Sequence, residues 1–304
     1  FAWRLGWRGI WKRLPQAPAT LSLAPKTTRP IRLEQYTKSV RETADNLRII
    51  DDALFRLMAE KEGVCQEILR TLLDMPSLNV VKVTAQSVVK SLHREVTLDA
   101  LCVLENGEYI NVEMQKGSGN DDVVRTRFHA AALTSAYTPK GTDFADVPQV
   151  TILYITEYDA LNNGQAVTHV KRCMKTKGGF IPVYDKEDIF FANTEIKEDS
   201  DKSELLQLFL RNKAFDDAKF PEISKAVKYF KETEGGRSEV CKTVENYAKI
   251  YAEEAAAESR REGRKEGENI LADTVVRLRQ GETPEQLAAR GIGQSTIDLA
   301  MTIK

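Results

Sequence analysis

Residues 96–116, VTLDALCVLENGEYINVEMQK, decide the fold of this chain. Two runs rich in β-branched, aromatic and aliphatic residues flank an Asn-Gly pair, a pattern that predicts two antiparallel strands joined by a tight turn. The first strand carries Asp99, and the second ends with Glu113 and Gln115. Two carboxylates and an amide therefore fall at one end of the predicted hairpin.

The register of this hairpin decides whether these polar side chains share a face, because successive residues of a strand point to opposite faces. A three-residue loop over 105–107, with Gly107 in the left-handed conformation, sets Asp99 opposite Glu113. Gln115 then lies on the same face. A two-residue loop would instead turn Asp99 among apolar side chains and bury an unpaired charge. The three-residue loop is therefore the predicted one.

Several further motifs follow in an order that resembles one nuclease family. The D…E-x-Q spacing of the hairpin resembles the PD-(D/E)XK nuclease core. The ordered set resembles the Rpn group of recombination-promoting nucleases, also called PD-(D/E)XK family transposases, from about Arg48 to Glu258. The matching segments are IDDALFRLM at 50–58, VKVTAQ at 81–86, LDALCVLENGEYINVEMQ at 98–115, R-x-R-F at 125–128 and ILYITEYDAL at 152–161. Leu98 replaces the Pro of the motif's name, and Gln115 replaces its Lys, as is usual in this branch.

The resemblance implies an α/β, restriction-endonuclease-like core with a mixed central sheet flanked by helices. It also implies a metal-dependent DNA endonuclease that hydrolyses phosphodiester bonds in recombination or in mobile elements. Asp99, Glu113 and the carbonyl of Met114 would bind Mg²⁺ or another divalent cation such as Mn²⁺, which prefer oxygen ligands. Gln115 would orient the attacking water.

Three more side chains are candidates for this site. Asp52, in the D-x-x-F segment, is a candidate additional acid, with a solvated helix surface as its alternative. Arg125 and Arg127 lie on a helix predicted from about Val123 to Tyr137, and they are candidates for contacts with DNA phosphates. Structural or surface roles are the alternative for both arginines. Basic residues over 171–177 are expected on a helical segment.

Charge is unevenly distributed along the chain. Of 44 basic residues, seven fall in residues 1–33, which contain no acid, so the rest has 37 basic against 45 acidic residues and a net charge of −8. A DNA-binding domain is usually basic. The balance therefore keeps open an alternative, a non-catalytic DNA-binding or assembly protein on a nuclease fold. A small-molecule hydrolase is less favoured, because the sequence shows no nucleophile–His pairing and no glycine loop that would cradle phosphate.

Composition shifts predict four segments. Residues 1–33, with tryptophans at 3, 7 and 11, are expected to be a basic disordered extension. A nuclease-like domain is expected over 34–234, a long charged helix over 235–280, and a short helical hairpin over 281–304. Mixed charges at i, i+4 spacing in the long helix suit a solvated helix or a homo-oligomer contact. Scattered cysteines and the lack of a long apolar run favour a cytoplasmic protein without stable membrane insertion.

Overall fold

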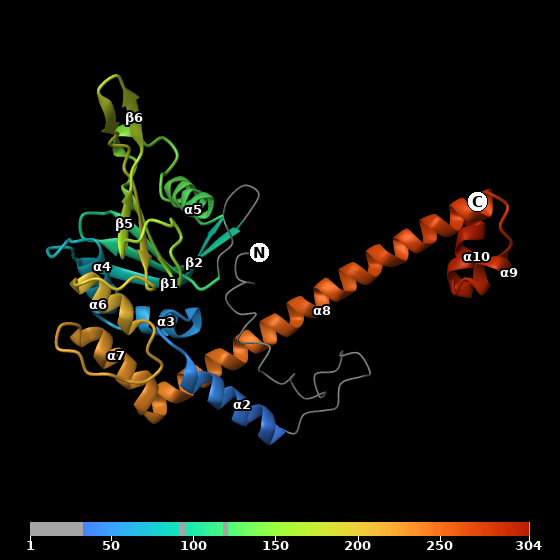
Figure 1. The fold of residues 1–304 in the computed structure, drawn as a ribbon, viewed down its shortest axis with the longest axis horizontal. Helices are drawn as coiled ribbons and strands as arrows, with labels where there is room; N and C mark the ends of the chain where they lie inside the picture. Colours follow the sequence, from blue (N-terminus) through green and yellow to red (C-terminus); the bar gives the residue numbers. More distant parts are fainter. Residues whose placement is uncertain (1–32, 91–94, 118–120, 304) are drawn as a thin grey trace. The chain divides into compact units, whose positions relative to one another are not determined.

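The computed structural model describes residues 33–90, 95–117 and 121–303 (Figure 1). The predicted extension over 1–33 lies outside these residues, except for its last one. The helices are α2 (Leu33–Asn46), α3 (Asp52–Ala59), α4 (Val64–Leu72), α5 (Asp122–Ala136), α6 (Asp201–Leu208), α7 (Pro221–Glu232), α8 (Glu234–Arg279), α9 (Pro284–Ala289) and α10 (Gln294–Ile303), with a 3-10 turn at Phe144–Asp146. The strands are β1 (Val80–Lys90), β2 (Glu95–Leu104), β3 (Tyr109–Gln115), β4 (Val150–Thr156), β5 (Val167–Val170), β6 (Cys173–Thr176), β7 (Gly179–Pro182) and β8 (Glu187–Asn193).

A six-stranded sheet in the order β1-β2-β3-β4-β8-β5 forms the centre of the fold. β1, β2 and β3 are antiparallel, β3, β4 and β8 are parallel, and β5 runs antiparallel to β8. The predicted mixed sheet with flanking helices is confirmed. β8 is not an edge strand, because β5 pairs with its outer side.

The predicted hairpin register is also confirmed. Ala100 pairs with Val112 and Val103 with Tyr109, so the ladder sets Asp99 opposite Glu113. Gly107 adopts φ 85°, and its N–H donates to the carbonyl of Leu104 at 2.9 Å. A β-branched or aromatic residue would be strained in that left-handed conformation, which explains the glycine at the end of the loop.

Helix α5 covers the face of the sheet that carries Asn111 and Glu113. Its buried side chains pack on a cluster that extends over four strands. The members of this cluster include Leu101, Ala130, Leu133, Ile152, Tyr154 and Phe191. Helix α3 contacts β1, β2 and β3, and α4 contacts α6 and α7. Burial of these apolar surfaces holds the hairpin rigidly at the centre of the sheet.

The expected basic helix over 171–177 is wrong. The chain there forms β6 and β7, a separate two-stranded hairpin that follows β5 directly. Lys, Arg and Met are good helix formers, but helix propensity is a weak preference that tertiary context overrides. The Gly178-Gly179 pair and Pro182 instead suit a turn and a strand end.

Helix α8 begins at Glu234, so Gly235 and Gly236 lie in its first turn. A Cβ on Gly236 would lie 2.1 Å from the carbonyl oxygen of Tyr229, which explains a glycine at this close approach. The chain divides into two compact units, one ending at Glu245 and the other starting at Asn246. In the second unit α8, α9 and α10 enclose a small core that includes Leu278, Leu287 and Ile297. Among the described residues, no helix is long and apolar enough to cross a membrane.

Candidate functional site

The two strands of the central hairpin exchange side-chain hydrogen bonds at Asp99 and Glu113. The backbone N–H of Asp99 donates to Oε1 of Glu113 at 3.3 Å, and the N–H of Met114 donates to Oδ2 of Asp99 at 2.9 Å. Each carboxylate therefore bonds to the backbone of the opposite strand. Both side chains are buried, with residue exposures of 5% and 8%. The predicted pair is thus brought together on one face of the sheet.

Strand β1 is distorted at the same level. Ala85 pairs with Ala100 and Ser87 with Leu98, which sets Gln86 opposite Asp99. Gln86 has φ 53°, a left-handed conformation that non-glycine residues seldom adopt inside a strand. Local departures of this kind re-aim side chains near functional sites.

A buried arginine joins two acids at this site. Nη2 of Arg56 lies 2.7 Å from Oδ1 of Asp99, and its Nε forms an ion pair with Asp52. Arg56 and Asp52 lie one turn apart on α3, so their side chains meet on one side of the helix. The structure therefore brings Asp52 to the site through Arg56. Sequence reasoning missed Arg56, although its spacing from Asp52 is the available signal.

Burial and neighbouring charges separate the protonation behaviour of the two carboxylates. Burial raises the pKa of Asp99 well above its usual range, and the charges of Glu113 and Asp52 add to this, while Arg56 acts in the opposite direction. Burial also acts to raise the pKa of Glu113, but His129 and the amide of Asn111, at 2.8 Å, outweigh it and hold that pKa below its usual value. In the absence of a bound cation, Asp99 therefore holds a proton more readily than Glu113.

Comparison with known protein families agrees with this geometry. A family model described as PD-(D/E)XK nuclease family transposase matches residues 51–237, more than half of the chain. The chain belongs to this family. No curated protein and no solved structure matches it. The matched range of this PD-(D/E)XK family member contains the whole six-stranded sheet and both carboxylates of the hairpin.

Gln115 occupies the position where the PD-(D/E)XK motif has lysine. Its side chain is buried, and its Nε2 donates to the carbonyl of Gly117 at 2.6 Å. The next residue, Lys116, forms an ion pair with the buried carboxylate of Asp51. Arg56 is thus the side chain that brings a permanent positive charge into contact with Asp99.

Arg125 and Arg127 lie on α5, the helix that also carries His129. Arg125 forms an ion pair with Asp121 at 3.3 Å, and exposed Arg127 interacts electrostatically with Glu187. Within the part of the chain that the structure describes, neither arginine forms an ion pair or hydrogen bond with Asp99 or Glu113.

The residues of the site fit a hard divalent cation. Over 33–90, 95–117 and 121–303 there is no group of three or more His, Cys, Asp or Glu side chains arranged to hold a metal. Mg²⁺ does not require one, because it keeps several waters and takes one or two carboxylates. Oδ1 of Asn111, whose amide donates to Glu113, is buried and has no hydrogen-bond partner in the described residues. This orphaned oxygen and the two carboxylates are the donor chemistry that Mg²⁺ prefers.

Asn111 and His129 are further members of the site that sequence reasoning did not assign. Nδ1 of His129 lies 3.5 Å from Oε1 of Glu113. Asn111 could have been found from strand alternation, since it shares a face with Glu113. His129 could have been found from its place on the buried side of α5, with Thr126 and Leu133.

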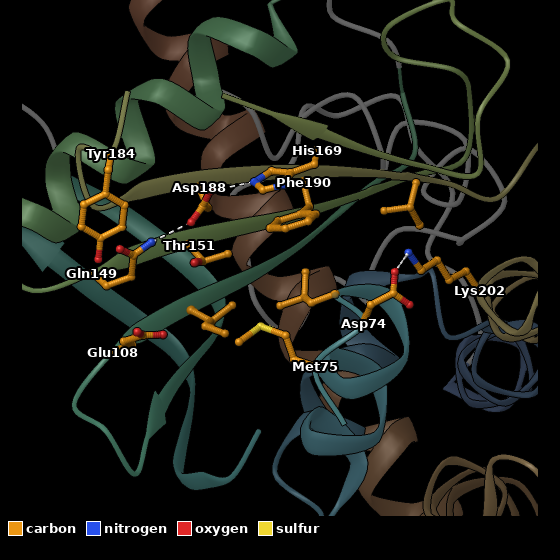
Figure 2. A pocket seen from close by; sticks show the side chains of 13 residues that line it. Asp74, Met75, Glu108, Gln149, Thr151, His169, Tyr184, Asp188, Phe190 and Lys202 are labelled. Carbon is orange, nitrogen blue, oxygen red and sulfur yellow. Dashed lines mark hydrogen bonds and ion pairs between the residues drawn. The ribbon is translucent and has the colours of Figure 1, made fainter. Parts of the chain in front are cut away.

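A hollow of about 460 Å³ lies on the opposite face of the sheet, which carries Ile110, Thr151 and Phe190. Figure 2 shows His169 and Gln149 directed at Asp188, at 2.6 and 2.8 Å, with Lys202 paired to Asp74 on the facing wall. These five polar side chains thus find partners within the lining of the hollow. Alternation along β3 keeps this hollow separate from Glu113.

Proposed function

We propose that the protein is a Mg²⁺-dependent DNA endonuclease that hydrolyses phosphodiester bonds in recombination or in mobile elements. The observation that carries the proposal is the buried Asp99–Glu113 pair at the point where β2 and β3 exchange side-chain hydrogen bonds. Membership of a nuclease family supports the reaction class and a DNA substrate.

In the proposed site Asp99, Glu113 and the carbonyl of Met114 would hold the cation. When bound, Mg²⁺ supplies Lewis-acid charge for the phosphate and makes a bound water more acidic. The hydrogen bonds from the backbone to both carboxylates fix their orientation before any ligand binds, which lowers the cost of assembling the site. Release of the proton from Asp99 prepares that carboxylate as an anionic ligand.

Gln115 is proposed to position the attacking water. The hydrogen bond from Nε2 to Gly117 fixes the plane of the amide and leaves Oε1 as an acceptor for that water. A neutral amide cannot replace the charge of lysine. Arg56, which also bonds Asp52, is proposed to offset negative charge on Asp99 instead. Arg125 and Arg127 are proposed to reach DNA phosphates farther along the duplex.

A non-catalytic DNA-binding or assembly role is the rival proposal, and one observation favours it. Arg56 already neutralises Asp99 with a protein cation, an arrangement that a site without metal could retain for stability. Calorimetric titration with Mg²⁺ separates the two roles. Binding that is lost in Asp99→Ala supports the nuclease, whereas no binding by the parent supports the rival.

The activity is tested by incubating the purified protein with supercoiled plasmid, with and without Mg²⁺, beside Asp99→Ala. We expect nicking by the parent only with Mg²⁺ and none by the variant. Gln115→Ala should retain Mg²⁺ binding but cut more slowly, and Gln115→Lys should cut faster than Gln115→Ala because it adds charge near the attacked phosphate. Nicking by Asp99→Ala at the parental rate would contradict the proposal.

A further inference from the structure

The hairpin of β6 and β7 stands apart from the six-stranded sheet. Its strands pair from Cys173 with Pro182 to Thr176 with Gly179, and all eight strand residues are exposed. Figure 1 shows it extending beyond β5. Because none of its strand residues is buried, the hairpin contributes little to the stability of the fold, and its sequence needs another explanation.

Charge is concentrated on this hairpin. The segment 171–182, KRCMKTKGGFIP, has four basic residues and no acid, in a chain whose residues beyond 33 carry a net charge of −8. At its foot Arg172 pairs with Asp185 at 2.6 Å and Lys171 with Asp188 at 3.3 Å. Toward the tip, Lys175 and Lys177 form no ion pair with any described residue. The foot is thus fixed to the sheet, while the charge of the tip is available to a partner.

Large apolar side chains lie among these cations. Phe180 is 71% exposed, Met174 53% and Ile181 50%. Lys175 pairs directly with Phe180, so a cation and an aromatic ring share one face of the ribbon. A surface that combines exposed apolar groups with unpaired cations marks an interaction site.

Duplex DNA fits both features. Its phosphates match the lysines, a two-stranded β-ribbon fits the major groove, and apolar side chains on DNA-binding elements contact bases or enter between base steps. We propose that the β6–β7 hairpin is a DNA-binding arm that contacts the duplex outside the Asp99–Glu113 site. The assignment of DNA as the partner of this arm rests on the proposed nuclease function.

The register of the sheet fixes where the foot of the arm lies relative to Glu113. Val170, the last residue before the arm, pairs with Ile189, which is in line with Ile152 and Asn111. Three strand spacings of about 4.8 Å and two residues of about 3.3 Å set the foot roughly 16 Å from Glu113. Because β5 is antiparallel to β8, the chain beyond Val170 continues toward the end of the sheet at which β3 begins, away from Glu113. The lysines near the tip are therefore farther from Glu113 than the foot is, and they would contact DNA beyond the cleaved bond.

The test is fluorescence anisotropy with a labelled 30-base-pair duplex in EDTA, over a series of salt concentrations. Lys175→Ala/Lys177→Ala is compared with Lys197→Ala/Lys213→Ala, which removes two exposed lysines elsewhere in the same unit. Each lost phosphate contact lowers the slope of log K against log salt by about 0.9, so the hairpin variant should lose about 1.8 and bind roughly 30-fold more weakly at 0.15 M salt. The control variant should change neither value.

Phe180→Ala supplies an uncharged test. It should weaken binding by about tenfold while leaving the salt slope unchanged, because it removes stacking or apolar contact but no cation. Circular dichroism should show parental melting for all the variants, since the altered side chains are exposed. Equal affinities of the two double-lysine variants would overturn the proposal. So would a hairpin variant that binds DNA normally but loses binding to phosphatidylserine vesicles, which would make the arm a membrane contact.

Binding in EDTA separates this inference from the nuclease proposal. If the parent nicks plasmid with Mg²⁺ but the hairpin variant binds DNA like the control variant, the arm is refuted and the nuclease stands. If no nicking occurs but the hairpin variant loses DNA affinity, the arm stands and the nuclease activity is refuted.

Discussion

Arg56→Met removes the cation that contacts Asp52 and Asp99. Arg56 is 4% exposed and Asp99 5%, so solvent screens their interaction little. Removing one partner of a buried ion pair leaves uncompensated charge and costs about 3–5 kcal/mol. For a domain of this size, that loss lowers the melting temperature by roughly 6–20 °C.

Mg²⁺ should reverse part of this loss. Without Arg56 the carboxylates gain more from a bound cation, so affinity for Mg²⁺ should rise. A ligand at 100 times its Kd stabilises the native state by about 2.7 kcal/mol. The free energy of unfolding is measured by far-UV circular dichroism in urea, with and without Mg²⁺.

Arg237→Met is the matched control. Arg237 pairs with Asp45 at 3.2 Å, but both side chains are about half exposed, at 51% and 53%. A surface pair contributes roughly 0–1 kcal/mol, and its loss should not depend on Mg²⁺. If Arg56→Met costs no more than Arg237→Met, or if Mg²⁺ stabilises both variants equally, Arg56 does not neutralise the buried carboxylates.

Three further predictions concern the supports of the site. Gly107→Ala should destabilise the protein by about 1 kcal/mol, because alanine is strained at the φ of 85° that Gly107 adopts. Gly263→Ala is the control: it lies inside α8, where alanine should stabilise the helix by roughly 0.5–1 kcal/mol. Urea unfolding measures both changes. Glu67→Ala should cost about 0.5–2 kcal/mol, because the Glu67 carboxylate accepts the N–H of Ile223 at 2.9 Å and so caps α7; Glu67→Gln should recover part of the loss. The raised pKa of Asp99 should make stability depend on pH in metal-free buffer. This contribution to the free energy of unfolding should be complete below the pKa of Asp99 in the unfolded chain, about 4, and should be lost as the pH rises through its higher pKa in the folded protein. Asp99→Asn should flatten this dependence in urea unfolding measured over a pH series.

The sequence was sufficient to predict the central hairpin because its determinants are local. Alternation fixes which residues share a face, and Gly107 with two preceding loop residues fixes the register. These rules gave the opposition of Asp99 and Glu113. The family resemblance added the mixed sheet, which local patterns could not order.

Contacts between distant segments could not be predicted in this way. The bond between Arg56 and Asp99 spans 43 positions, and only the packing of α3 on the sheet creates it. The segment over 171–177 was assigned to a helix from its basic residues, but backbone pairing with 179–182 determines its structure. The edge strand β5 could not be predicted either, because it is only four residues long and carries little periodic signal.

The most direct test of the central claim is plasmid nicking by the parent, Glu113→Gln and Glu108→Gln. The first substitution removes one charge from the buried pair while keeping its size, and the second makes the same change on a partly exposed residue of the same hairpin. We predict that the parent and Glu108→Gln nick plasmid equally with Mg²⁺ and not in EDTA, and that Glu113→Gln neither nicks plasmid nor binds Mg²⁺ measurably. Nicking by Glu113→Gln at the parental rate would contradict the assignment of this site.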